Sequence, residues 1–158
     1  MAPTITPFLW FDDDLEDAIA FYRDIFPNST VGEVSRYPEG SPLPAGTVLG
    51  ATFELEGQRF MGINGGPEFP FTEAFSLYVE VETQDEIDRL WTALTADGGE
   101  PSQCGWLKDR FGLSWQIVPS RLPELLTDPD PERASRAMQA MLKMTKLDLA
   151  ALEAAADG

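Results

Sequence analysis

Few residues in this chain could do chemistry, and the most informative count is that of histidine, which is zero among 158 residues. Without imidazole, Ser-His-Asp and Cys-His catalysis, HExxH zinc sites and every histidine metal ligand are excluded. Cys104 could be a reactive thiol, but it has no imidazole base, and Lys108 is the only cation near it in sequence. We therefore expect Cys104 to be a buried structural residue.

Three other motifs look like ligand sites but have simpler structural explanations. Asp12–Asp14 directly precede an apolar helical pattern, where aspartates cap a helix and complement its dipole. Gly65-Gly66 is too short for a phosphate loop and lacks the lysine and helix that should follow. Asp109 and Gly112, in KDRFG, are typical of a turn between two strands. None of these motifs predicts a metal or phosphate site.

Charge and composition exclude several classes of partner. The net charge of -16, with no cluster of Lys or Arg, disfavours nucleic acid and anionic membranes. No apolar run approaches the roughly 18 residues that would span a bilayer, and the start, MAPTITPFLWFDDD, lacks the basic region of a signal peptide. One cysteine fits a reducing compartment, so we expect a cytoplasmic protein.

The hydrophobic pattern predicts the same order of elements twice. The first half contains an apolar strand at 5–11, a helix at 15–26 and strands at 30–37, 46–55 and 58–64. After a Gly/Pro-rich loop at 64–73, the second half contains a strand at 76–81, a helix at 84–94 and short strands near 103–108 and 113–118. LWFDDDLEDAIAFY aligns with YVEVETQDEIDRLW as a weak internal repeat. The order indicates two βαβββ modules, 1–66 and 67–119, and an α+β fold without Rossmann alternation.

The tail, residues 120–158, has a different pattern, with three helices separated by prolines and by Thr145–Lys146. An apolar stripe on the middle helix comprises Met138, Met141, Leu142 and Met144. Such a methionine stripe is usually packing surface. We therefore expect the tail to pack on the domain formed by residues 1–119 or to form a dimer interface.

Several segments taken together carry a family resemblance. With ITPFLWF, INGGPEFPFTEAFSLYVEV, QCGWLKDRFGLSWQIVP and the ending TKLDLAALEAA, the chain resembles the PhnB-like group of the vicinal-oxygen-chelate (glyoxalase/bleomycin-resistance) superfamily over nearly its whole length. The resemblance implies two βαβββ modules forming a curved mixed sheet around a cleft, with C-terminal helices, and a homodimer. Members of the group often carry the label of a 3-demethylubiquinone-9 3-methyltransferase.

The resemblance also locates the positions that would hold a metal. Metal-using relatives place ligands, typically His or Gln and Glu, on the first, fourth, fifth and eighth strands. In this chain these positions hold Thr6, one of Phe60, Gly62 and Asn64, then Ser76, and Gln116. None is ionised at pH 7, whereas divalent metals need charged oxygen, thiolate or imidazole ligands. We predict no metal and no cofactor.

Strand alternation then predicts what lines the cleft, because residues two apart face the same side of a sheet. On the first strand it directs Thr6, Phe8 and Trp10 to the cleft, and Ile5, Leu9 and Phe11 to the helix. The predicted ligand-binding residues are Trp10, Asn64, Ser76, Tyr78, Trp106 and Gln116. Aromatic walls with a few neutral polar groups suit a small, partly apolar organic molecule. Trp10 and Tyr78 could equally be core, and alternation turns Trp115 away from the cleft.

Three functions remain open at this point. The chain could bind a small molecule without chemistry, or be an enzyme on a small metabolite, with Glu54, Glu80 or Asp109 as an acid or base if burial raised its pKa. It could also be a dimeric scaffold or regulatory protein. The methyltransferase label has no support in the residues, because no GxGxG turn follows a parallel strand. No catalytic residue can be named.

Overall fold

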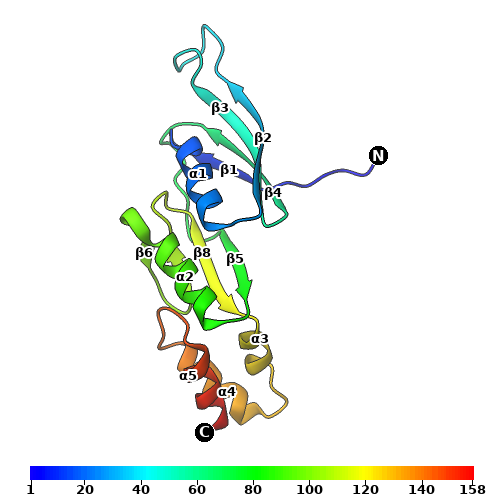
Figure 1. Cartoon of the computed structure of the whole chain (residues 1–158), viewed down its shortest axis with the longest axis vertical. Helices are drawn as coiled ribbons and strands as arrows, with labels where there is room; N and C mark the ends of the chain where they lie inside the picture. Colours follow the sequence, from blue (N-terminus) through cyan, green and yellow to red (C-terminus); the bar gives the residue numbers. More distant parts are fainter. The chain divides into compact units, whose positions relative to one another are not determined.

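A computed structural model describes residues 1–158 and divides them into two compact units, Met1–Phe71 and Thr72–Gly158. The first unit contains β1 (Phe8–Phe11), α1 (Leu15–Ile25), β2 (Ser29–Arg36), β3 (Val48–Leu55) and β4 (Gln58–Asn64) (Figure 1). The second contains β5 (Ser76–Val81), α2 (Gln84–Leu94), the short 3₁₀ helix η1 (Ala96–Gly98), β6 (Glu100–Pro101), β7 (Trp106–Lys108), β8 (Ser114–Pro119), α3 (Arg121–Leu126), α4 (Pro131–Met141) and α5 (Leu149–Asp157).

Each unit contains one four-stranded mixed sheet, and the strand order is the same in both. The first sheet has the order β1-β4-β3-β2 and the second β5-β8-β7-β6. The first and last strands of each module pair in parallel, and the remaining neighbours pair antiparallel. The predicted α+β fold of two βαβββ modules is therefore confirmed.

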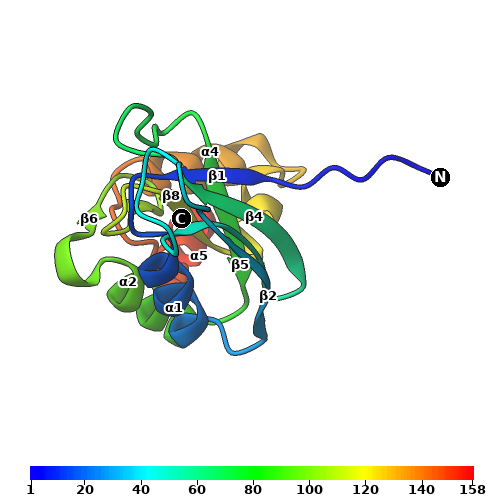
Figure 2. The same cartoon turned by 90° about the horizontal axis from the view of Figure 1, so that it is seen from above.

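In the first unit, α1 covers one face of the sheet (Figure 2). Leu9 and Phe11 are buried on that face, as alternation predicted. Gly62 permits close packing of the helix, because a Cβ atom built there would lie 2.6 Å from Leu15 Cδ1. The prediction that Ile5 packs against the helix is wrong: β1 begins only at Phe8, and Ile5 is 95% exposed.

In the second unit, α2 covers one face of its sheet in the same way. A capping box fixes its start: Thr83 accepts a hydrogen bond from the Glu86 amide, and the Glu86 side chain accepts one from the Thr83 amide. The predicted helix face is buried and comprises Ile87, Leu90, Trp91 and Leu94. Trp115 and Ile117 of β8 are also buried, so one face of β8 belongs to the core.

The tail helices α3, α4 and α5 belong to the second unit. Their core consists of Val118, Leu122, Leu125, Ala137, Leu147, Leu152 and Ala156. Backbone hydrogen bonds join the tail to the β6–β7 loop, from Cys104 N to Met144 O (2.9 Å) and from Gly105 N to Thr145 O (2.8 Å). Met144 packs on the tail core, whereas Met138 and Leu142 are exposed, so only part of the methionine stripe is packed in the chain.

No helix combines the length and the apolar composition that crossing a membrane requires.

Candidate functional site

The face of the second sheet opposite α2 brings together four of the six predicted ligand residues. β8 pairs in parallel with β5, which sets Gln116 beside Tyr78, and antiparallel with β7, which sets Gln116 beside Trp106. Tyr78, Gln116 and Trp106 thus form one cross-strand row with an amide between two aromatic rings. Tyr78 is 50% exposed, and burial, more than the nearby charge of Glu80, raises the pKa of its phenol. The Tyr78 hydroxyl therefore stays protonated at neutral pH.

A second cross-strand row lies next to it on the same face. Ser76 of β5 pairs with Ser114 of β8, and Ser114 pairs with Lys108 of β7. The two rows are linked, since Gln116 Nε2 donates a hydrogen bond of 2.9 Å to Ser76 Oγ. We call these two rows the second open face.

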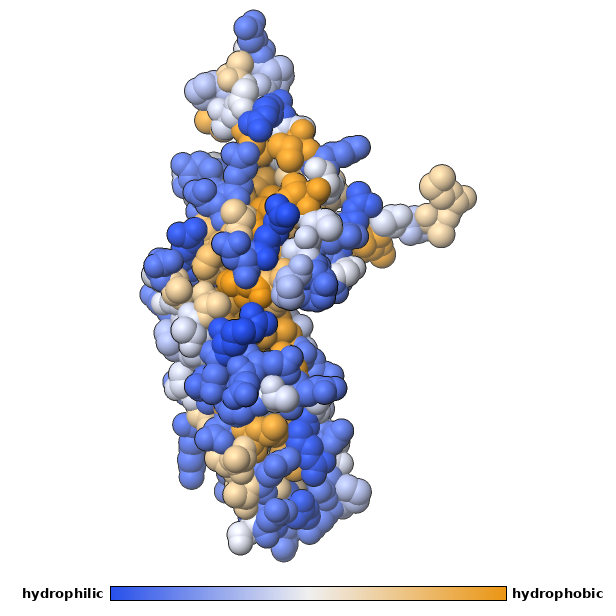
Figure 3. Space-filling model, viewed as in Figure 1, coloured by the Kyte–Doolittle hydropathy of each residue, from blue (hydrophilic) through white to orange (hydrophobic).

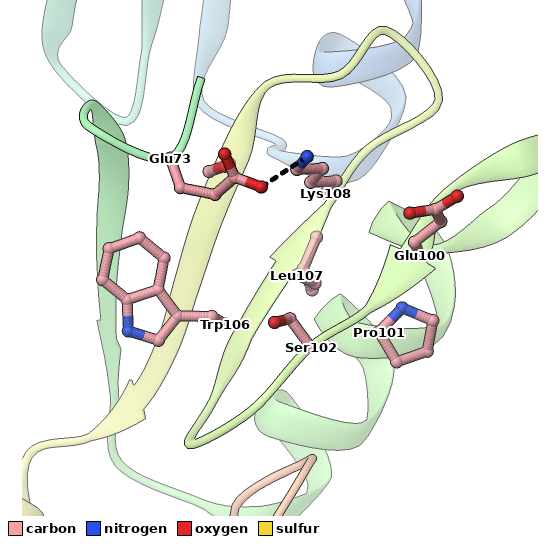
Figure 4. A pocket seen from close by; sticks show the side chains of 8 residues that line it. Glu73, Glu100, Pro101, Ser102, Trp106, Leu107 and Lys108 are labelled. Carbon is pink, nitrogen blue, oxygen red and sulfur yellow. Dashed lines mark ion pairs between the residues drawn. The ribbon is translucent and has the colours of Figure 1, made fainter. Parts of the chain in front are cut away.

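Sequence reasoning missed the charged residues of this face. Lys108 Nζ lies 2.5 Å from Glu73 Oε1, on the segment that precedes β5, and this ion pair lies over the β7 side of the sheet (Figure 4). The hydrogen bond between them lowers the pKa of the Glu73 carboxyl and raises that of the Lys108 ammonium. Lys108 lies two residues from Trp106, and Ser114 two from Gln116. Alternation could therefore have placed both on this face.

Asp109 does not contribute to the open face. It is 2% exposed, and its carboxylate accepts hydrogen bonds from the amides of Phe111 (2.9 Å) and Leu113 (3.1 Å) and from the Trp115 indole (2.8 Å). Gly112 completes the turn with a φ of 87°. The predicted turn and the predicted core position of Trp115 are confirmed. With three donors already bound to it, the Asp109 carboxylate is a structural group.

Trp10, in the first unit, already uses its indole N–H in a hydrogen bond and its ring in an aromatic contact. Its indole Nε1 donates to Gly66 O at 2.9 Å, and its ring meets Phe69 edge to face at 5.0 Å. A Cβ atom on Gly65 would lie only 2.3 Å from the indole, so that glycine is needed where the loop crosses it. Trp10 therefore holds the 64–73 loop, and its role in ligand binding stays a prediction.

Asn64 faces α1, so the predicted orientation of β4 is wrong. Its Oδ1 accepts from the Leu15 amide at 2.9 Å, its Nδ2 donates to Val48 O at 3.1 Å, and the residue is 3% exposed. Phe60 and Gly62, which share this side of the strand, also pack inward. The expectation that Asp12–Asp14 cap the helix is confirmed in position but not in bonding. Asp14 occupies the N-cap position but makes no side-chain cap bond, and Asn64 bonds the free amide of Leu15 instead.

The outer face of β4 consequently carries Met61 and Ile63. Together with Phe8, Val34, Thr52 and their neighbours, they line an open groove of about 550 Å³ within the first unit. On the side of the molecule drawn in Figure 3, hydrophobic patches also interrupt a largely hydrophilic surface. We call this groove the first open face. Its lining is mostly apolar, and Glu33 is its only charged member.

The remaining candidates for chemistry are poorly placed. Glu54 and Glu80 are exposed, and Cys104 is half-buried rather than buried. Nowhere do three His, Cys, Asp or Glu side chains gather as metal ligands would. At the expected metal positions of the second sheet, Ser76 and Gln116 offer a hydroxyl and an amide already bonded to each other. This donor set does not fit a divalent cation.

Comparisons with known proteins agree with this fold. The family model for 3-demethylubiquinone-9 3-methyltransferase matches residues 3–118. None of the curated proteins matches the sequence. A PhnB protein from Bacillus cereus that carries the same methyltransferase label is 39% identical, with a TM-score of 0.68, over 75% of this chain and 100% of that one.

Two more distant solved structures share the fold. Protein PA1353 from Pseudomonas aeruginosa is 22% identical, with a TM-score of 0.59, over 75% of this chain and 98% of that one. The fosfomycin resistance protein FosX from Listeria monocytogenes, solved with Mn(II) and sulfate, is 18% identical, with a TM-score of 0.54, over 74% of this chain and 92% of that one.

Proposed function

This chain belongs to the 3-demethylubiquinone-9 3-methyltransferase family, and we propose that it is a metal-free, PhnB-like member of the glyoxalase superfamily that binds a small, partly apolar organic molecule. The observation that carries the proposal is the row Tyr78–Gln116–Trp106 on the second open face. Two aromatic side chains there flank one amide. Rings supply stacking surface, and a neutral amide orients a ligand by hydrogen bonds.

The proposal excludes a divalent metal because of the ligands present. FosX was solved with Mn(II), but here Ser76 and Gln116 supply neutral oxygen and nitrogen only. Neutral groups compensate poorly for the water that a divalent ion loses on binding. The same two side chains suit an organic ligand, which can replace their mutual hydrogen bond with bonds of its own.

Binding without methyl transfer fits the architecture better than the family's label does. A methyl donor bound in the common Rossmann manner needs a glycine-rich turn between a parallel strand and a helix. In this chain the strand-to-helix segments are FDDDL after β1 and ETQD after β5, which contain no glycine. Asp109 is buried and already accepts three hydrogen bonds, so it does not stand out as an acid or base.

Two further predictions accompany the proposal. A homodimer follows from the resemblance to PhnB-like proteins, and a cytoplasmic location from the single cysteine. Sedimentation velocity on the purified chain tests the first of these directly.

A thermal-shift screen of metabolites and aromatic drugs tests the function. We expect hits that raise the melting temperature, as any ligand that binds only the folded state must. Gln116→Leu should abolish their stabilising effect, whereas the matched exposed glutamine variant Gln103→Leu should leave it unchanged. The proposal fails if no compound stabilises the chain, or if hits stabilise wild type and Gln116→Leu equally.

A further inference from the structure

A small cavity lies beside β7, at the edge of the second open face. Its volume is about 120 Å³, and its polar lining consists of Glu73, Glu100, Ser102, Lys108 and Ser114, with Trp106 as a wall (Figure 4). A space of this size admits only a small fragment of a ligand.

The Ser114 hydroxyl gives this cavity an unused hydrogen-bonding group. Ser114 is 1% exposed, and its Oγ has no hydrogen-bond partner in the chain. Buried hydroxyls are almost always paired, because leaving one without a partner loses the hydrogen bonds that water would have made. Because Ser114 also lines the cavity, a ligand bound in the cavity could supply the hydrogen-bond partner that its hydroxyl lacks in the chain.

The charges around the cavity are unequal. Glu100 of β6 is the register partner of Lys108, and Glu73 approaches the same ammonium from the other side. Two carboxylates therefore face one ammonium, in a chain whose net charge is already -16. This balance attracts a cation and repels an anion. The Trp106 ring adds a face over which a cation can also bind.

Lys108 does not turn Ser114 into a nucleophile. A Ser-Lys pair needs a neutral lysine as base, whereas the bond to Glu73 raises the pKa of the Lys108 ammonium. Lys108 therefore cannot serve as the base for acyl transfer, and the cavity is suited to binding.

We infer that this cavity binds the protonated amine end of a small organic molecule, with the ammonium against the Glu73 and Glu100 carboxylates, beside Lys108, and an adjacent ligand oxygen on the Ser114 hydroxyl. The inference rests on the proposed function, whose ligand class it narrows to amine-bearing compounds. The rest of such a ligand would extend along the Tyr78–Gln116–Trp106 row.

Three probes of nearly equal size and different charge test the inference: ethanolamine, ethylene glycol and glycolate. In ¹⁵N-¹H NMR titrations of the full chain, ethanolamine should shift the Ser114 and Lys108 amides and the Trp106 indole signal, and the shifts should saturate. With so few atoms, its dissociation constant should be on the order of millimolar. Ethylene glycol should bind several-fold more weakly, and glycolate should cause no saturable shift.

Variants identify the groups responsible. Glu73→Gln and Ser114→Ala should each weaken ethanolamine binding about threefold or more, since each removes one hydrogen bond to the probe. The matched control is Glu124→Gln, because Glu124 is as exposed as Glu73 and pairs with Arg121 at 2.7 Å away from the cavity. That control should bind like wild type. The dispersion of the NMR spectra shows directly that each variant is folded.

The inference is overturned if glycolate binds as tightly as ethanolamine, if no probe gives saturable shifts, or if Glu73→Gln binds ethanolamine like wild type. Its failure is separable from that of the proposed function. If screening hits lose binding in Gln116→Leu but bind Glu73→Gln and Ser114→Ala like wild type, only the amine site is rejected. Ethanolamine binding without any Gln116-dependent hit would reject only the wider ligand face.

Discussion

The two open faces differ although the sheets that carry them have the same strand order. The first is a mostly apolar groove lined by Phe8, Met61 and Ile63 among others, and Glu33 is the only charged residue in its lining. The second alternates rings with polar groups and adds an ion pair at its edge. One βαβββ module thus provides mainly hydrophobic surface and the other directional recognition. Shared topology fixes where side chains stand, and residue type decides what each face can bind.

The buried polar side chains show the same contrast. In the first unit Asn64, on β4, joins the first residue of β3 to the start of α1. In the second, Asp109 closes the turn before β8 and holds Trp115. Each therefore supports the strand that carries its own open face.

The largest effect is expected from Asp109→Ala. It removes a buried carboxylate that accepts three hydrogen bonds, one of them from the Trp115 indole. The free energy of unfolding of the second unit should fall by about 3–5 kcal/mol. Hydrogen exchange of the β8 amides measures this loss.

Asp12→Ala is the control, since Asp12 is exposed and should change stability by about 0.5 kcal/mol or less. A loss below about 1 kcal/mol in Asp109→Ala would mean that its hydrogen bonds do not support the second face.

Asn64→Ala should have the next largest effect, and on the first unit. It removes the buried side chain to which the Leu15 amide and the Val48 carbonyl are bonded. The free energy of unfolding of the first unit should therefore fall by about 2–3 kcal/mol. Urea unfolding followed by hydrogen exchange in β1 and β4 gives the value. If stability is unchanged and ligand binding is lost instead, Asn64 acts on the ligand and the orientation described here is wrong.

Trp106→Ala and Met61→Ala together show which of the two open faces contributes more to ligand affinity. Loss of the Trp106 ring should weaken binding of a screening hit about tenfold, since a stacked aromatic contributes about 1 kcal/mol or more beyond its area. Met61→Ala, the matched change on the first open face, should leave the affinity unchanged. Isothermal titration of both variants measures the difference. If Met61→Ala causes the larger loss of affinity, the first open face and not the second binds the ligand.

The smallest effect is expected from the Glu73–Lys108 ion pair, and it depends on pH. The pKa of Glu73 is lowered on folding, so its stabilising contribution is complete above the ordinary value of 4.5 and is lost as pH falls through the lowered pKa. The difference in melting temperature between wild type and Glu73→Gln should thus be constant from about pH 6 to 8 and shrink below about pH 4.5. A difference that grows on acidification would contradict the sign of this shift.

Most elements could be predicted from the sequence because hydrophobic periodicity is strong in α1, α2, β5 and β8. The two-residue strand β6 (Glu100–Pro101) was not predicted, since so short a strand leaves no periodicity. The prediction failed on β4, where QRFMGIN places apolar side chains on both faces, so alternation alone cannot choose between them. Two contacts between residues that are far apart in sequence determine which face of β4 turns to α1. Leu15 needs the space above Gly62, and its amide needs the Asn64 oxygen.

Most of the second open face was predictable and part of it was not. Ser76, Tyr78, Trp106 and Gln116 share a face because alternation and pairing follow directly from the strands. Lys108 and Ser114 obey the same rule and could have been included. Glu73 could not, since it lies in a loop, and only the three-dimensional path of residues 72–75 brings its carboxylate to Lys108.

At the metal positions expected from the resemblance, Ser76 and Gln116 supply no charged ligand. Titrating the chain with Mn(II) and recording the electron paramagnetic resonance signal of the free ion tests this most directly. The signal should rise in proportion to added Mn(II) from the first addition, in wild type and in Gln116→Leu alike. Disappearance of one equivalent per chain in wild type, with recovery of the signal in Gln116→Leu, would contradict the account.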